Sequence, residues 1–109
     1  MASRSCKLGL VLPESFHAAM IAQAARCPSG RRGALQAAYA AALQALLADL
    51  DAGEAVTFPA MRGPKIRVTL RLPRGLCAAV RARLADLTLK LTDFACAAVS
   101  RFLAQAEGA

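Results

Sequence analysis

The chain has 109 residues, a length typical of one compact domain that buries a core without disulfides or metals. Hydrophobic residues make up 57% of it, but about a quarter of the chain is alanine, so the composition indicates a helical and soluble protein. The net charge of +7 favours an anionic partner, either nucleic acid or an anionic membrane surface. The sequence lacks a Ser/His/Asp set, paired carboxylates and a phosphate-binding loop, so we expect no enzyme and no catalytic residue.

Two apolar stretches raise the question of a membrane segment. The run at 8–12 is short, ends at Pro13 and is followed by no small-residue cleavage site, so it does not indicate a signal peptide. The stretch 34–50 carries no charge before Asp49, but it is mostly alanine, contains two glutamines and is short for a bilayer. We therefore expect a buried helix, a cytoplasmic location and no membrane partner.

The cysteines and the single His17 do not form a metal-binding pattern. Zinc sites need clustered thiolates or imidazoles, and no Cys-x-x-Cys pair occurs here. We expect no metal and no cofactor, and we interpret the cysteines as small buried residues of a protein in a reducing compartment. The four cysteines are Cys6, Cys27, Cys77 and Cys96.

The chain nearly repeats itself with a shift of sixty residues. Residues 7–20, KLGLVLPESFHAAM, align with residues 67–80, RVTLRLPRGLCAAV, and the register continues to later pairs such as Leu43 with Leu103. A repeat of this kind predicts two copies of one structural unit. We place the first unit at 6–50, a linker at 51–64 and the second unit at 65–106, within a single pseudo-symmetric domain.

Each unit begins with an alternating segment that predicts a strand with one apolar and one polar face. A proline closes each strand, and Pro13 and Pro73 are expected in the first turn of the following helix. The apolar sets are Leu8, Leu10 and Leu12 in the first unit, and Ile66, Val68, Leu70 and Leu72 in the second.

Two helices are predicted to follow each strand. The turns between them are expected at 27–33 and 87–92, with Thr92 as an N-cap, and the second helices at about 34–50 and 93–106. Apolar stripes in the first helices are Phe16, Met20 (or Ala19), Ala24 and Cys27, and Leu76, Val80, Leu84 and Leu87. Those in the second helices are Leu35, Tyr39, Leu43, Leu46, Leu47 and Leu50, and Phe94, Ala98, Val99, Phe102 and Leu103.

A lone strand with two helices buries little apolar surface and leaves its strand edges unpaired, so we expect the two units to pair their strands over a four-helix core. The segment RVTLRLPRG at 67–75, followed by two helices, resembles the ribbon-helix-helix superfamily that includes the Arc and MetJ repressors. Tandem single-chain versions are similar in plan to conjugation proteins such as TraY. The expected fold is mainly α with a small β ribbon: two β-α-α repeats forming an intramolecular pseudo-dimer with a two-stranded antiparallel ribbon.

The resemblance implies sequence-specific binding of double-stranded DNA through the ribbon in the major groove. It assigns base contacts to three alternating residues of each strand and phosphate contacts to the start of each second helix. Because Gly9 and Val11 cannot hydrogen-bond a base, we expect an asymmetric target to which the second unit makes most direct contacts. The base-contacting residues are Arg67, Thr69, Arg71, Lys7, Gly9 and Val11; the phosphate-contacting residues are Ser29, Gly30, Arg31, Arg32, Lys90 and Thr92.

The biological role stays open between a transcriptional repressor and an accessory factor of conjugation or plasmid maintenance, with relaxosome or transcription proteins as partners. Self-association on adjacent DNA sites also stays open. The main alternative is a protein-interaction module that has the same fold but no DNA binding. A membrane-surface protein is a third hypothesis, based on alanine-rich helices and basic charge.

Overall fold

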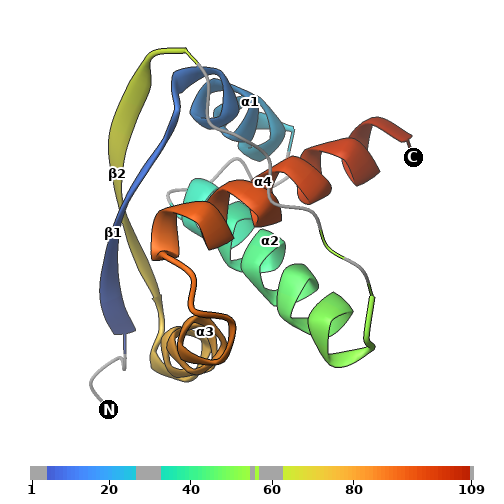
Figure 1. Cartoon of the computed structure of the whole chain (residues 1–109). Coiled ribbons are helices and arrows are strands. Elements are labelled where there is room, and N and C mark those ends of the chain that lie inside the picture. Colours follow the sequence, from blue (N-terminus) through green and yellow to red (C-terminus); the bar gives the residue numbers. More distant parts are fainter. Residues whose placement is uncertain (1–4, 27–32, 55, 57–62, 109) are drawn as a thin grey trace.

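The computed structural model describes residues 5–26, 33–54, 56 and 63–108 of the chain. Strand β1 (Ser5–Pro13) is followed by helices α1 (Glu14–Ala25) and α2 (Ala34–Asp51), and strand β2 (Lys65–Pro73) by α3 (Arg74–Leu87) and α4 (Leu91–Gly108) (Figure 1). The order β-α-α therefore occurs twice. The molecule is mainly helical with one small antiparallel sheet, as the sequence predicted.

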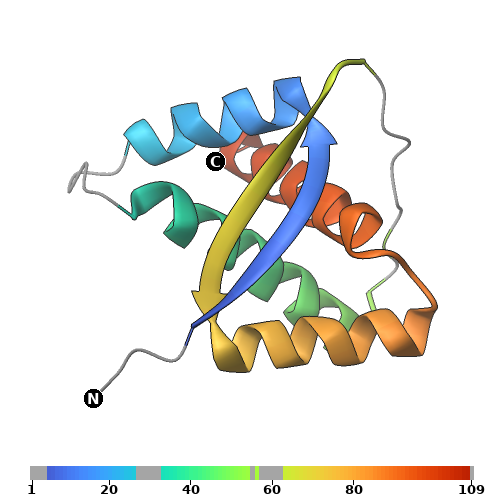
Figure 2. The ribbon, with the colours of Figure 1, turned by 90° about the vertical axis from the view of Figure 1, so that its left-hand side faces the viewer.

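The two strands form a ribbon that crosses one side of the helical layer (Figure 2). They pair antiparallel, with Ser5 opposite Pro73 and Pro13 opposite Lys65. Helices α1 and α3 lie at opposite ends of the ribbon. The predicted inner face is confirmed, since its members are buried, apart from Ile66, which is half-buried. The buried members are Leu8, Leu10, Leu12, Val68, Leu70 and Leu72.

The two prolines stand one residue earlier than predicted. Pro13 and Pro73 are the last residues of their strands, and the helices begin at Glu14 and Arg74. Both prolines combine φ near −55° with an extended ψ of 137° or 140°, so the proline ring fits while the chain is still extended. The strand therefore passes into the helix with no intervening loop.

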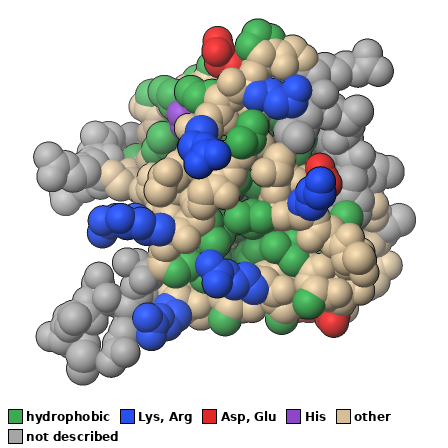
Figure 3. Space-filling model, turned by 60° about the vertical axis from the view of Figure 1, so that its left-hand side comes forward, with side chains coloured by type: hydrophobic (Ala, Val, Ile, Leu, Met, Phe, Trp, Pro, Cys, Tyr) green, Lys and Arg blue, Asp and Glu red, His purple; other side chains and the backbone are tan. Residues whose placement is uncertain are grey.

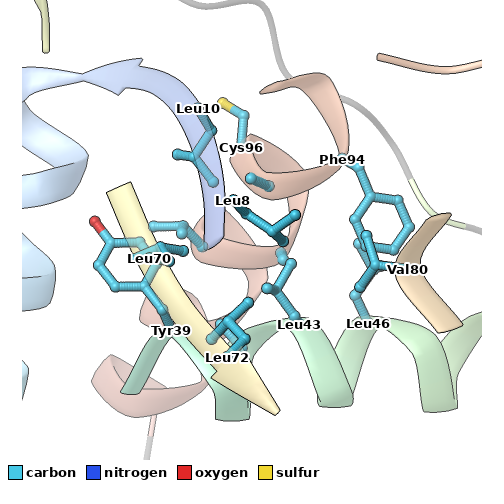
Figure 4. Packing of buried hydrophobic residues seen from close by; sticks show 14 of the residues in the cluster. Leu8, Leu10, Tyr39, Leu43, Leu46, Leu70, Leu72, Val80, Phe94 and Cys96 are labelled. Atoms are coloured by element: carbon cyan, nitrogen blue, oxygen red, sulfur yellow. The ribbon is translucent and has the colours of Figure 1, made fainter. Parts of the chain in front are cut away.

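Helices α2 and α4 supply most of the core beneath the ribbon (Figure 4). Tyr39 and Leu43 of α2 lie under the ribbon leucines, while Leu46 meets Val80 of α3 and Phe94 of α4. Residues 94–99 of α4 are all buried, so this stretch is enclosed on every side. Its small residues allow that enclosure, because Ala and Cys let neighbouring elements approach closely. The small residues concerned are Ala95, Cys96, Ala97 and Ala98.

Several details of both units differ from the prediction or lie outside the described residues. Leu87, expected in the core, is 39% exposed, because α3 ends there and Thr88 takes a left-handed backbone conformation that redirects the chain. Helix α4 begins at Leu91, so Thr92 lies inside its first turn and is not the N-cap. Helices α2 and α4 also extend to Asp51 and Gly108, one and two residues beyond the expected ends. Cys27, predicted in the core, lies outside the described residues.

Two ion pairs join α2 to the second unit. Arg101 of α4 donates through Nε and Nη2 to Oδ2 of Asp49, at 3.1 and 2.6 Å, and Arg83 of α3 pairs with Asp51. Both acids lie at the C-terminal end of α2, where the helix dipole disfavours negative charge. The arginines offset that unfavourable placement and at the same time neutralise two of the molecule's acids.

A disulfide joins Cys6 of β1 to Cys77 in the first turn of α3, with the Cα atoms 6.6 Å apart. The expectation that these two cysteines are unpaired is therefore wrong. Cys6 faces Leu72 across the ribbon, so the antiparallel register brings it beside the helix that follows β2. Sequence spacing alone could not indicate this, since the two cysteines lie 71 positions apart in the chain. Cys96 is a free, buried thiol, and burial together with the charge of Asp93 raises its pKa.

Loss of this disulfide should destabilise the protein. A cross-link that closes a 71-residue loop restricts the unfolded chain, and such bonds typically contribute about 2–4 kcal/mol. We expect reductant to lower the free energy of unfolding of the wild type, measured by urea denaturation, by an amount in this range. The matched control is the C6S/C77S double variant, whose stability should not respond to reductant. Equal stability of the wild type with and without reductant would contradict the pairing.

Candidate nucleic-acid interface

The ribbon's outer face brings together all six residues that were predicted to contact bases. Period-two alternation directs them away from the helices, and all are exposed except Val11, which is half-buried. On the space-filling view of this side, Lys and Arg side chains spread over the surface while acidic ones are few (Figure 3). The face is formed by Lys7, Gly9 and Val11 of β1 and by Arg67, Thr69 and Arg71 of β2.

The strand register determines which of these residues are neighbours. Gly9 lies opposite Thr69, and these two occupy equivalent places in the sixty-residue repeat. On one side of this central pair Lys7 lies opposite Arg71, and on the other side Val11 lies opposite Arg67. The face therefore has two ends of different chemistry: two cations at one, and a cation beside an aliphatic side chain at the other.

The cations of this face have no acidic partner in the described part of the chain. No carboxylate there lies within 4.0 Å of the amine of Lys7 or the guanidinium groups of Arg67 and Arg71. Lys7 and Arg71 also stand directly opposite each other, an arrangement of like charges that destabilises a sheet. Unneutralised positive charge on the exposed face of a ribbon suits an anionic ligand.

Side chains from the second helices hold both edges of the ribbon. The Val11 N–H donates to Oγ1 of Thr92 in α4 at 3.3 Å, and the Arg71 N–H donates to Oε1 of Gln36 in α2 at 2.6 Å. Residues 11 and 71 are equivalent in the repeat, and each is held by the first turn of the other unit's second helix. These bonds satisfy backbone groups that a two-stranded sheet leaves free and fix the ribbon to the helices. This role of Gln36 was not predicted, because no local sequence pattern indicates it.

The predicted phosphate-contacting positions are placed only in part. Lys90 is exposed immediately before α4, while Thr92 is half-buried against Val11. Asp93 adds a negative charge to the same helix turn, which opposes phosphate binding by the helix dipole there. Lys90 is therefore the better placed of the two for a phosphate. The other predicted positions, Ser29, Gly30, Arg31 and Arg32, lie outside the described residues.

The described residues enclose no pocket for a small molecule and contain no group of three His, Cys, Asp or Glu side chains that could hold a metal ion. Among them, no helix has the length and apolar character needed to cross a bilayer. His17 and Tyr39 share a hydrogen bond of 2.7 Å at the edge of the core, and burial raises the pKa of the Tyr39 hydroxyl.

Comparisons with known proteins yield no relative: no family model, curated protein or solved structure matches the chain.

Gly9 should accept a side chain without loss of the fold. A Cβ built on it meets nothing within 4 Å, and its φ is not in the left-handed region. Because threonine favours strands and glycine weakens them, Gly9→Thr should raise the free energy of unfolding by up to about 1 kcal/mol. Chemical denaturation of the variant beside the wild type measures this, with Thr69→Gly as the reciprocal control. A destabilised Gly9→Thr protein would show that the outer face is not open at this point.

Proposed function

We propose that this protein binds double-stranded DNA as a ribbon-helix-helix protein whose two β-α-α repeats form an intramolecular pseudo-dimer. The observation that carries the proposal is the exposed, unneutralised basic face of a two-stranded antiparallel ribbon. A ribbon of this width enters the major groove of B-DNA, where base pairs present distinct donor and acceptor patterns.

The register supports the pseudo-dimer. In two strands related by a two-fold axis, the residue on the axis lies opposite its equivalent in the other strand. A residue on one side of the axis lies opposite the equivalent of the residue at the same distance on the other side. Gly9 faces Thr69 in this way, and Lys7 and Val11 face Arg71 and Arg67. The edge hydrogen bonds have equivalent donors, Val11 and Arg71, and each acceptor lies in the first turn of a second helix, although the sixty-residue register pairs Gln36 with Cys96 and not with Thr92.

The outward side chains suit contacts with base edges. Arginine forms bidentate hydrogen bonds with O6 and N7 of guanine, which makes Arg67 and Arg71 the main candidates for base contacts. Thr69, between them on the same strand, can donate to or accept from a base. Lys90 would add a phosphate contact outside the ribbon, and phosphate contacts position a protein on DNA without specifying sequence.

Such a protein would act as a transcriptional repressor or as an accessory factor of conjugation or plasmid maintenance. A cytoplasmic location would make the Cys6–Cys77 disulfide an exception to the reduced state that is usual for cysteines there. Pseudo-dimers bound at adjacent sites could contact one another, and relaxosome or transcription proteins would be further partners. The alternative, an interaction module without DNA binding, is favoured by β1 alone, whose Gly9 and Val11 offer no hydrogen-bonding side chain.

Arg67→Ala and Arg71→Ala should each weaken binding to the preferred duplex by roughly 1–3 kcal/mol and relax its specificity. Arg81→Ala is the matched control, since it removes the same charge from an exposed position on α3, outside the ribbon. Gel-shift titrations of a duplex selected from random DNA measure all three. Wild-type affinity in both ribbon variants would contradict the proposed interface.

The affinity should also fall steeply with salt. Each phosphate contact releases condensed counterions, so the logarithm of the association constant should fall against the logarithm of salt concentration with a slope of ~0.9 per contact. Repeating the titration at several salt concentrations gives this slope. A flat response would argue for the interaction module, and tighter binding to anionic vesicles than to DNA would argue for a membrane surface.

A further inference from the structure

We infer that the two ends of the ribbon recognise chemically different half-sites in DNA. The Lys7–Arg71 end takes a half-site with two guanines, and the Val11–Arg67 end takes one with a guanine next to a thymine. This inference rests on the proposed function and adds the class of base that each end contacts.

The antiparallel register separates the two arginines of β2. Arg67 and Arg71 lie on opposite sides of the central Gly9–Thr69 pair, four residues apart along one strand. Four residues of strand span about 13 Å, close to the rise of four base steps at about 3.4 Å each. Each half-site therefore receives one arginine. This differs from the expectation of one dominant strand, because the asymmetry lies between the ends of the ribbon rather than between its strands.

The Lys7–Arg71 end presents hydrogen-bond donors only. Both side chains are exposed, and neither has a carboxylate of the described residues within 4.0 Å. In the major groove, guanine offers two acceptors, whereas cytosine presents an amino donor and adenine a donor beside an acceptor. Two neighbouring cations therefore match two guanines. The repulsion between them in the free protein would also be relieved there, since both donors would face acceptor-rich edges.

The Val11–Arg67 end combines an aliphatic side chain with one cation. Val11 has no polar side-chain atom, and its backbone N–H is already bonded to Thr92, so it can offer only its methyl groups. The 5-methyl group of thymine is the apolar feature of the major groove. Arg67, across the ribbon from Val11, is left to contact a guanine. This end should therefore prefer a thymine at the place where the other end prefers a second guanine.

The middle of the ribbon should contribute little to this difference. Gly9 has no side chain, and the space where its Cβ would stand is open, so Thr69 alone can contact the central base pairs. The difference between the two half-sites should therefore come from the residues on either side of the centre. These are Lys7 and Arg71 at one end and Val11 and Arg67 at the other.

The test is selection of preferred sites from a random duplex library by the full chain and two variants. The wild type should select a non-palindromic site. Val11→Arg makes the equivalent positions 11 and 71 alike and should select guanines in both halves, whereas Arg71→Val places valine at both positions and should select thymine in both. Arg81→Ala, which leaves the ribbon unchanged, should select the wild-type site. Far-ultraviolet circular dichroism and thermal unfolding show whether each variant is folded, and the two reciprocal substitutions provide independent readouts.

A second measurement targets the thymine methyl. Replacing the selected thymine by uracil removes only that methyl and should weaken wild-type binding about fourfold, the value of one buried methyl group. Val11→Ala should reduce the difference in affinity between the thymine and uracil duplexes. Replacing a thymine by uracil elsewhere in the site should have no effect on binding. A palindromic wild-type site, or unchanged preferences in both reciprocal variants, would overturn this inference while leaving DNA binding intact. No binding to any duplex at low salt would overturn the proposed function and this inference with it.

Discussion

The antiparallel register between β1 and β2 is the constraint on which the rest of the structure depends. Side chains alternate along a strand, so a slip of one residue would turn the leucines outward and the basic residues inward. Burial of a leucine is worth about 1.5–3 kcal/mol, and a slip of one strand would expose its three inner side chains, a loss of roughly 5–9 kcal/mol. This is comparable to the whole stability of a small domain. One register therefore determines both the core and the basic outer face.

The helices maintain this register in two ways. Tyr39, Leu43 and Phe94 fill the space beneath the ribbon, and α4 can lie there because four of its buried residues are small. Thr92 and Gln36 bond to the ribbon's two edges, so that it cannot slide past the helical layer without breaking both contacts. The cross-link between Cys6 and Cys77 ties one end of the ribbon to α3 as well. The outer side chains are thereby presented on a backbone held along both edges.

Local periodicity was enough to predict the elements and the two faces of the ribbon, because alternation and burial are properties of each strand itself. Features that depend on contacts between elements could not be predicted in this way. Thr92 resembles an N-cap in the sequence, yet its side chain bonds to β1, and Cys6 meets Cys77 only because the strands run antiparallel. Leu87 continues an apolar stripe but falls where α3 ends. The six outer residues were identified from alternation, whereas which of them face each other required the register.

In the proposed pseudo-dimer, the backbone follows a two-fold axis that the side chains do not. Equivalent inner positions hold apolar residues, identical in Leu10 and Leu70 and different in Leu8 and Val68, because both copies face one shared core. Equivalent outer positions differ, as with Val11 and Arg71, because they face solvent, where a substitution disturbs no packing. In a homodimer every outer residue would occur twice, and a symmetric ligand would follow. A single chain has no such requirement, so each end of the ribbon can be matched to a different sequence of bases while the pairing of the two strands stays symmetric.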